Sequence, residues 1–184
     1  DQAGDMLQKA IVDNDADAML EVSKRWPNSL WAPQALYEAG ASIYVKTRDA
    51  GEQGDYAGMM RAAGCMAKAA SQGDPMLAVA SLAGRATIYH GMGMTNYARS
   101  VCRDMRKLCR DKGITLNDTI EFAGSERTIM DFLRKCEGSK PLRLEPDNAP
   151  ESLVGPVQQA FAVKGQDVII VRDQEYRPIR QGAN

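Results

Sequence analysis

Ser42-Ile43-Tyr44, followed by Asp55-Tyr56-Ala57, is the first of two similar stretches in this chain. The second is Thr87-Ile88-Tyr89, followed by Asn96-Tyr97-Ala98. Their separation of roughly forty residues is typical of repeats that are built from two helices. Because a single helix pair cannot bury its apolar face alone, the recurrence predicts a stack of helix-turn-helix repeats.

Apolar spacing indicates that these stretches belong to a longer helical region. From Ala3 onwards, apolar residues recur three and four positions apart, which is typical of amphipathic helices. Asp15, Asp55 and Asp74 are residues that cap helix starts, and Gly113 is a typical residue after a last helical turn. We therefore expect helices near residues 3–12, 16–25, 30–50, 56–70, 75–89 and 97–112.

The chain after Gly113 has a different pattern. Thr119-Ile120-Glu121-Phe122 alternates like a short strand, and Val168-Ile169-Ile170-Val171 is a second strand candidate. Between them, we expect a helix that starts at Ser125 and reaches Cys136. The prediction is thus a mainly α fold with two parts: a helical repeat domain over residues 1–113, and a small C-terminal α+β appendage with short strands and one or two helices over residues 114–184.

Composition and charge restrict the function classes. The formal net charge is −1, so the chain as a whole has no bulk attraction to nucleic acid or to a membrane surface. No apolar run approaches the roughly 20 residues that a membrane-spanning helix needs. The sequence begins at Asp1 rather than Met, from which we expect that a leading segment was removed, by signal cleavage or by trimming. A cleaved signal would make the protein periplasmic or secreted, and the alternative is the cytoplasm.

The cysteines, Cys65, Cys102, Cys109 and Cys136, are compatible with two disulfides. If Cys102 and Cys109 share one helix, their Cα atoms are about 10 Å apart, beyond the ~7 Å reach of a disulfide. The remaining pairings are 65–102 with 109–136, which we favour, and 65–109 with 102–136. The alternative is four reduced cysteines that pack as small apolar residues. A zinc site is not expected, because the chain has no Cys-x-x-Cys pair and one histidine.

Two segments resemble known helical repeats. Pro27-Asn28-Ser29, followed by Ala32-Pro33-Gln34-Ala35-Leu36-Tyr37-Glu38-Ala39-Gly40, resembles the helix junction of tetratricopeptide repeats in bacterial envelope proteins. Gly54-Asp55-Tyr56-Ala57, with Lys68-Ala69-Ala70-Ser71-Gln72-Gly73-Asp74, resembles the related Sel1-like repeat. The resemblance covers residues 5–112, and the sequence departs from it at Pro75-Met76. It implies a protein-binding role, because most members of these repeat families bind proteins.

Candidate catalytic residues are few. His90 is the single histidine, and its place at an expected helix end favours capping or packing over general-base chemistry. Gly91-Met92-Gly93-Met94 follows a helix rather than a strand, so we interpret it as a turn and not as a phosphate loop. Glu38 and Glu121 are candidate acids for glycan hydrolysis, which needs paired carboxylates, but nothing in the sequence brings them together. We expect no catalytic residue, cofactor or metal.

Candidate partner-binding residues lie in two places. Trp26 and Trp31 flank the first expected helix junction, either as core residues or, if exposed, as binding anchors. The second place is a cationic stripe, which is either a docking site for an anionic partner or a solvated outer face. A homo-oligomer is one option, because the acidic N-terminal helices of a second copy could meet the stripe. The stripe consists of four arginines at helical spacing: Arg99, Arg103, Arg106 and Arg110.

These features predict a non-enzymatic protein–protein interaction scaffold or adaptor in a bacterial cell-envelope assembly. The expected partner is another protein. Nucleic acid is not expected, because the aromatic or groove-reading elements that bind it are missing. One alternative function is a secreted effector, or an inhibitor or immunity-type protein, that binds and occludes one target. The other alternative is a cell-wall hydrolase.

Overall fold

The computed structural model describes residues 1–50 and 55–137, and the backbone of three further strands: β3 (Gln159–Phe161), β4 (Ile169–Arg172) and β5 (Glu175–Pro178). The chain divides into two compact units, Asp1–Ser139 and Lys140–Asn184. In the second unit, β4 lies between β3 and β5 and pairs antiparallel with both. The strand expected at Val168 to Val171 is therefore present as β4, shifted by one residue.

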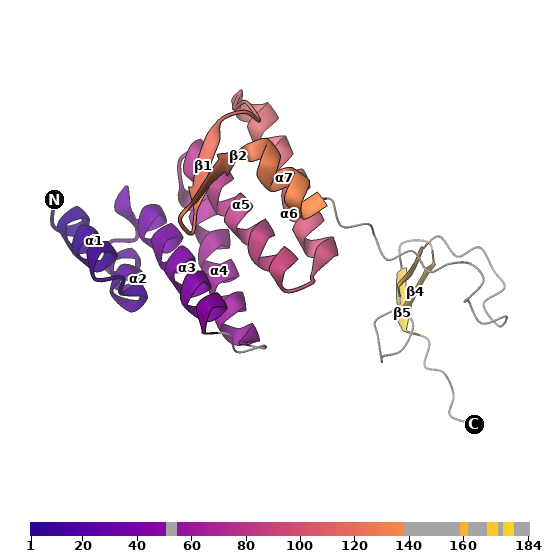
Figure 1. Ribbon diagram of the computed structural model, residues 1–184, viewed down its shortest axis with the longest axis horizontal. Helices are drawn as coiled ribbons and strands as arrows, with labels where there is room; N and C mark the ends of the chain where they lie inside the picture. The colour runs from indigo at the N-terminus through magenta and orange to yellow at the C-terminus, as the bar shows by residue number, and fades with distance from the viewer. Residues whose placement is uncertain (51–54, 138–158, 162–168, 173–174, 179–184) are drawn as a thin grey trace. The chain divides into compact units, whose positions relative to one another are not determined.

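The first unit is mainly helical, which confirms the predicted fold class at this level (Figure 1). Six helices follow one another, and then a two-stranded sheet and a seventh helix complete the described part of the unit. The elements are α1 (Gln2–Val12), α2 (Ala16–Arg25), α3 (Trp31–Asp49), α4 (Tyr56–Gln72), α5 (Pro75–Gly91), α6 (Thr95–Lys112), β1 (Thr119–Phe122), β2 (Ser125–Thr128) and α7 (Ile129–Glu137).

Helix ends follow the caps that the sequence predicts. The carboxylates of Asp15, Asp55 and Asp74 accept hydrogen bonds of 2.8–3.0 Å from backbone N–H groups in the first turns of α2, α4 and α5. Gly113 follows α6 with a φ of 68°, the left-handed conformation that ends a helix at little cost for glycine. These local signals explain why the predicted helix bounds agree with the structure to within a few residues.

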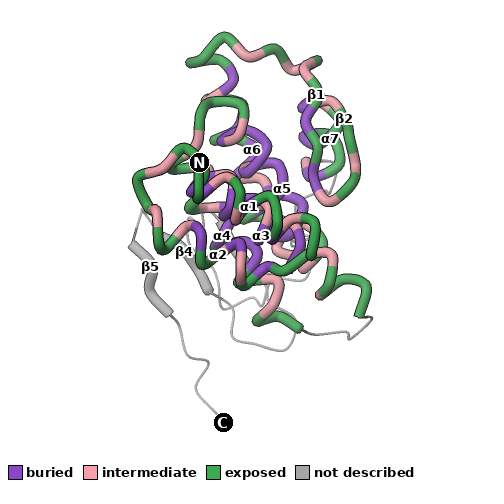
Figure 2. The backbone as a smooth tube through the Cα atoms, turned by 90° about the vertical axis from the view of Figure 1, so that its left-hand side faces the viewer, coloured by how far each residue is buried: buried purple, intermediate pink, exposed green. Residues whose placement is uncertain are grey.

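The six helices pack in chain order, each on the next. In addition, α1 contacts α3, α3 contacts α5, and α5 contacts α7. Residues on the facing sides of the helices are buried, as Figure 2 shows. Many of these residues are alanines with almost no exposed surface, which allows the helix axes to approach closely. They include Ala35, Ala39, Ala62, Ala69 and Ala83.

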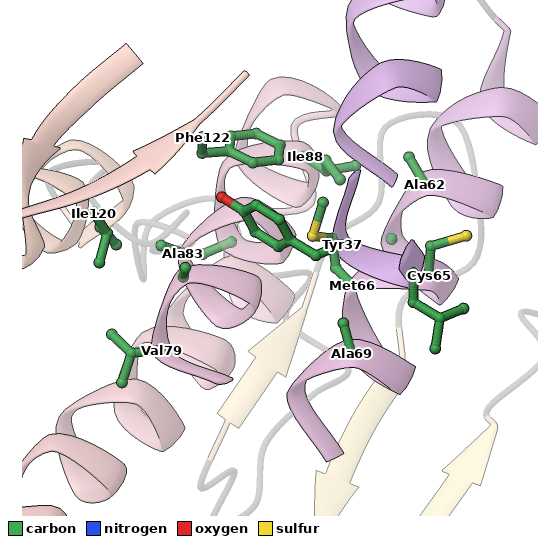
Figure 3. Packing of buried hydrophobic residues seen from close by; sticks show 14 of the residues in the cluster. Tyr37, Ala62, Cys65, Met66, Ala69, Val79, Ala83, Ile88, Ile120 and Phe122 are labelled. Atoms are coloured by element: carbon green, nitrogen blue, oxygen red, sulfur yellow. The ribbon is translucent and has the colours of Figure 1, made fainter. Parts of the chain in front are cut away.

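Met66 of α4 fills the space between α3, α4 and α5, and its side chain is fully buried (Figure 3). A Cβ atom at Gly40 of α3 would lie 2.8 Å from the Met66 methyl and 3.2 Å from the backbone oxygen of Ala62. A Cβ atom at Gly84 of α5 would lie 3.1 Å from the Met66 sulfur. The long, flexible methionine therefore occupies space that two glycines leave open.

The segment after α6 contains a hairpin that the sequence predicts only in part. The strand β1 is present as expected, but residues 125–128 form the second strand, and the expected helix start at Ser125 is wrong. Phe122 pairs with Ser125, so the turn has two residues, Ala123 and Gly124, with φ values of 53° and 73°. Two successive positive φ angles are typical of a type I′ hairpin turn. Ala-Gly is not among its common sequences, which explains why the sequence indicated a strand followed by a helix rather than a hairpin.

The hairpin packs on the helices through β1. Phe122 is buried, its ring centroid lies 5.2 Å from that of Tyr44 on α3, and a Cβ atom at Gly84 of α5 would lie 2.7 Å from its ring. The Tyr37 hydroxyl of α3 donates a hydrogen bond to the backbone oxygen of Glu121. The hairpin and α7 therefore belong to the helical unit, which extends to Ser139, whereas the sequence predicted a boundary at residue 113.

Candidate functional site

The predicted cationic stripe lies on the outer side of α6. Arg103, Arg106 and Arg110 are exposed, and Arg99 is half-buried. The opposite side of the helix faces the core with small and sulfur-containing side chains. The stripe arginines therefore share one face, as their spacing predicts. The buried residues of α6 are Ala98, Val101, Cys102, Met105 and Cys109.

Arg106 is held within the protein. Its Nε and Nη2 atoms donate hydrogen bonds of 3.0 and 2.6 Å to the two carboxylate oxygens of Glu137 on α7. This bidentate contact lowers the pKa of Glu137 and raises the pKa of Arg106. The Arg106 side chain therefore ties two helices together, a role that the sequence did not indicate because Glu137 is 31 positions away.

The other stripe arginines are less engaged. Arg110 lies 3.9 Å from the carboxylate of its neighbour Asp111, and both side chains are exposed. Such a pair contributes little to stability. In residues 1–50 and 55–137, no carboxylate forms an ion pair with Arg99 or Arg103. Arg99 and Arg103 are thus the stripe arginines whose positive charges are most available to a partner.

Several carboxylates of the acidic N-terminal helices are engaged in contacts within the protein. Asp1 and Asp15 cap α1 and α2. Asp17 accepts a hydrogen bond of 2.5 Å from the Arg61 guanidinium of α4, and this bond and charge lower the Asp17 pKa. Asp5 and Asp13 are exposed. The acidic surface is therefore smaller than the count of carboxylates suggests.

The two tryptophans have different surroundings. Trp31 is 40% exposed, its indole N–H donates to Oδ2 of Asp1 at 2.9 Å, and Gly4 of α1 lies against its ring. Trp26 is half-buried against the core, with the Arg25 guanidinium 5.0 Å from its ring centroid. Leu30, beside Trp31, is 93% exposed. Trp31 with Leu30 is thus the part of this junction that a partner can reach.

Glu38 and the exposed Glu121 are close enough in the structure for their charges to interact, which the sequence could not indicate. Glu38 of α3 is half-buried and accepts a 2.6 Å hydrogen bond from the side-chain amide of Gln34. Burial is the main cause of a raised Glu38 pKa. The hydrogen bond from Gln34 lowers this pKa, and the negative charge of Glu121 on β1 raises it. Burial and the same two carboxylates raise the pKa of Tyr37 as well. A carboxyl group with a raised pKa beside a second carboxylate is suited to acid–base chemistry.

Replacing Glu38 with glutamine is expected to stabilise the protein at neutral pH. A carboxyl whose pKa is raised by folding favours the folded state below its ordinary pKa of 4.5, and this contribution is lost as the pH rises through the folded pKa. Glu38→Gln should raise the Tm by a few degrees at pH 7, and the gain should vanish near pH 4. Thermal melts over this range test it, with the exposed Glu126→Gln as control. An equal gain at both pH values would contradict the assignment.

All four cysteines are free and buried in the structure. Cys102 on α6 and Cys136 on α7 are close enough that each thiol shifts the pKa of the other, raising that of Cys102 and lowering that of Cys136. Cys65 lies on α4 against Gly40 of α3, and Cys109 lies on α6 near Asp118. The contact between Cys102 and Cys136 favours the 102–136 bond of the second predicted pairing, but Cys65 and Cys109 lie at different helix interfaces, so the 65–109 bond of that pairing is not supported.

His90 and the glycines after it lie where two helices meet. His90 is in the last turn of α5, and its backbone oxygen accepts a 3.0 Å hydrogen bond from Gly93. Gly93 has a φ of 73°, and the N–H of Met94 donates to the backbone oxygen of Tyr89 at 2.8 Å. The interpretation of this segment as a helix–helix turn is confirmed.

Comparisons with known proteins assign this chain to no family, so its class of protein is stated here from its architecture. No protein-family model, curated protein or solved structure shows significant similarity to this chain. Within residues 1–50 and 55–137, no three His, Cys, Asp or Glu side chains gather into a metal-ion site. Over the described residues, every helix is too short or too polar to span a bilayer. The first unit is thus a mainly helical protein domain with a small two-stranded sheet.

Proposed function

We propose that the first unit is a short stack of helix pairs, of the tetratricopeptide or Sel1-like kind, which binds other proteins and has no catalytic activity. The observation that carries the proposal is the order of the helix contacts. Each helix packs on the next, and α1, α3, α5 and α7 also contact one another in sequence. Nearest-neighbour stacking of this kind builds an extended surface from many elements, and such surfaces bind partners in repeat proteins.

The arginine stripe gives the proposed partner its chemistry. Arg99 and Arg103 are two cations on one helix face, with Lys107 exposed one turn further along. An acidic surface on another protein would complement them and would accelerate the encounter. The proposed setting is a multi-protein assembly of a bacterial cell envelope, with the protein in the periplasm or secreted.

Reversing two charges of the stripe is expected to weaken partner binding. Arg99→Glu with Arg103→Glu places two carboxylates opposite an acidic partner, and the Kd should rise about 30-fold. The full chain is first used to purify its partners from envelope fractions of the source cells, and each Kd is then measured with the purified partner. Lys9→Glu with Lys68→Glu is the matched control, because both lysines are exposed and lie outside α6.

The number of proteins that the chain captures separates an adaptor from a secreted effector or inhibitor. Several stoichiometric envelope proteins are expected for an adaptor, whereas one tightly bound target would favour a secreted effector or inhibitor. Equal binding by the stripe variant and the control would remove the stripe as the binding surface. A chain that captures no protein, under conditions where it is folded, would overturn the proposal.

A cell-wall hydrolase is a second candidate, which the proximity of Glu38 and Glu121 favours. In such an enzyme Glu38, whose pKa is raised, would act as the general acid, and Glu121 would be the second carboxylate. Wild-type protein should then release soluble fragments from purified cell wall, and Glu38→Gln should not, although its stability is undiminished. Absence of release by the wild-type protein removes this candidate.

A further inference from the structure

The helix α7 is attached at its start to the segment that follows α6, and near its end to α6 itself. At its start, the N–H groups of Ile129 and Met130 donate to the backbone oxygens of Asp118 and Leu116, just beyond α6, at 3.0 and 2.9 Å. Near its end, Glu137 accepts the two hydrogen bonds from Arg106. Because the start of α7 is near the end of α6, and its end is beside Arg106, α7 runs back along α6 (Figure 1).

Two fully buried thiols lie beside the Arg106–Glu137 contact. Cys102 is one turn before Arg106 on α6, and Cys136 directly precedes Glu137 on α7. Neither cysteine has exposed surface, and the two thiols interact where α6 packs against α7. The interaction with Cys102 lowers the pKa of Cys136 against the effect of burial, and the charge of Lys135 acts in the same direction as Cys102.

We propose that Cys102 and Cys136 are a disulfide modification site, at which oxidation fastens α7 to α6 as a redox-sensitive clasp. The two side chains lie on the facing sides of α6 and α7, and the adjacent ion pair between Arg106 and Glu137 fixes the position of one helix along the other. Cys65 packs at a different interface, against Gly40 of α3, and is not part of the clasp.

Glutathione disulfide is the class of oxidant that the reaction requires. The Cys136 thiolate attacks one glutathione sulfur, a mixed disulfide forms, and one glutathione thiolate leaves. Cys102, as its thiolate, then attacks the Cys136 sulfur and releases the second glutathione. The two protons from the cysteines end on the two glutathione molecules, so two thiols are oxidised and one glutathione disulfide is reduced. Because both sulfurs are buried, the reaction takes place before α7 docks or while it is transiently open.

The clasp has a structural consequence for the end of the helical unit. The buried face of α7, with Ile129, Phe132 and Leu133, covers the side of α5 and α6. A disulfide would close a loop that contains the hairpin and most of α7, and this restricts the unfolded chain. Oxidation is expected to raise the Tm by about 10 °C and to slow amide hydrogen exchange in α7.

The test is the thiol count of the full chain after equilibration with mixtures of reduced and oxidised glutathione. Samples are quenched with acid, labelled with N-ethylmaleimide in guanidinium chloride, and analysed as intact protein and as peptides. We expect oxidised protein with two labels, on Cys65 and Cys109, and a linked peptide that joins Cys102 to Cys136. Four labels at every glutathione ratio, or linked peptides that contain Cys65 or Cys109, would overturn the proposal.

Variants separate the clasp from general effects on folding. Cys65→Ala with Cys109→Ala should still lose two thiols and should keep the Tm difference between oxidised and reduced protein. Cys102→Ala or Cys136→Ala should abolish both. The thiol count of the wild-type protein tests whether Cys102 and Cys136 form a disulfide even where these variants fold poorly. Loss of thiols without any change in exchange of the α7 amides would show that the bond forms but does not act as a clasp.

Discussion

Gly40→Ala is expected to lower the free energy of unfolding by about 2–3 kcal/mol. The added methyl group would lie 2.8 Å from the Met66 methyl, 3.1 Å from Cβ of Cys65 and 3.2 Å from the Ala62 backbone oxygen. Met66 can change its rotamer, but Cys65 and Ala62 are on α4, so the methyl group forces α3 and α4 apart. Urea titration monitored by circular dichroism measures the change.

Gly64→Ala is the matched control for Gly40→Ala. Gly64 is exposed in the middle of α4, and a Cβ atom there would have no neighbour within 4 Å. Alanine stabilises an open helical position by about 0.5–1 kcal/mol relative to glycine. The two substitutions, identical in chemistry, should therefore shift the urea midpoint in opposite directions. A stabilising Gly40→Ala would contradict the close packing of α3 on α4.

Phe122→Ala is expected to lower the free energy of unfolding by about 3–5 kcal/mol. Phe122 is 3% exposed and contacts Tyr44 of α3 and the backbone at Gly84 of α5, so its removal leaves a cavity between the hairpin and two helices. Faster amide hydrogen exchange should appear first in β1 and β2, because they lose their main apolar contact. Urea titration and hydrogen-exchange mass spectrometry measure these two effects.

Phe122→Leu provides the control for the hairpin. Leucine keeps most of the apolar volume and loses the ring contact with Tyr44, so the expected cost is about 1–1.5 kcal/mol. Equal stability of the alanine and leucine variants would indicate that the hairpin does not depend on this side chain. A large loss in both, with unchanged exchange in β1, would place the effect elsewhere in the core.

Much of the helical part was predictable because its signals are local. Asp15, Asp55 and Asp74 cap helices through N–H groups two or three residues away, and Gly113 ends α6 through its own φ angle. The face of α6 that carries the arginines follows from helical spacing alone. Each of these features depends on residues within one or two turns, and sequence order already places them together.

The hairpin and the candidate sites depend on contacts that span long separations. Ser125 was expected to begin a helix, but the positive φ angles of Ala123 and Gly124 turn the chain, and the contact of Phe122 with Tyr44 stabilises that turn. Glu38 and Glu121 influence each other's charge because the neighbouring Tyr37 of α3 bonds to the backbone oxygen of Glu121 on β1. No periodicity connects positions that are so far apart in the chain.

The sequence by itself determined the helices, their caps, and the alanine and glycine positions that allow close packing. The tertiary structure alone decided that Arg106 is bound to Glu137, that Cys102 faces Cys136, and that Glu38 lies near Glu121. The physical reason is the range of the interactions. Backbone hydrogen bonds and caps act within a few residues, whereas these side-chain pairs form only after packed helices bring distant segments into contact.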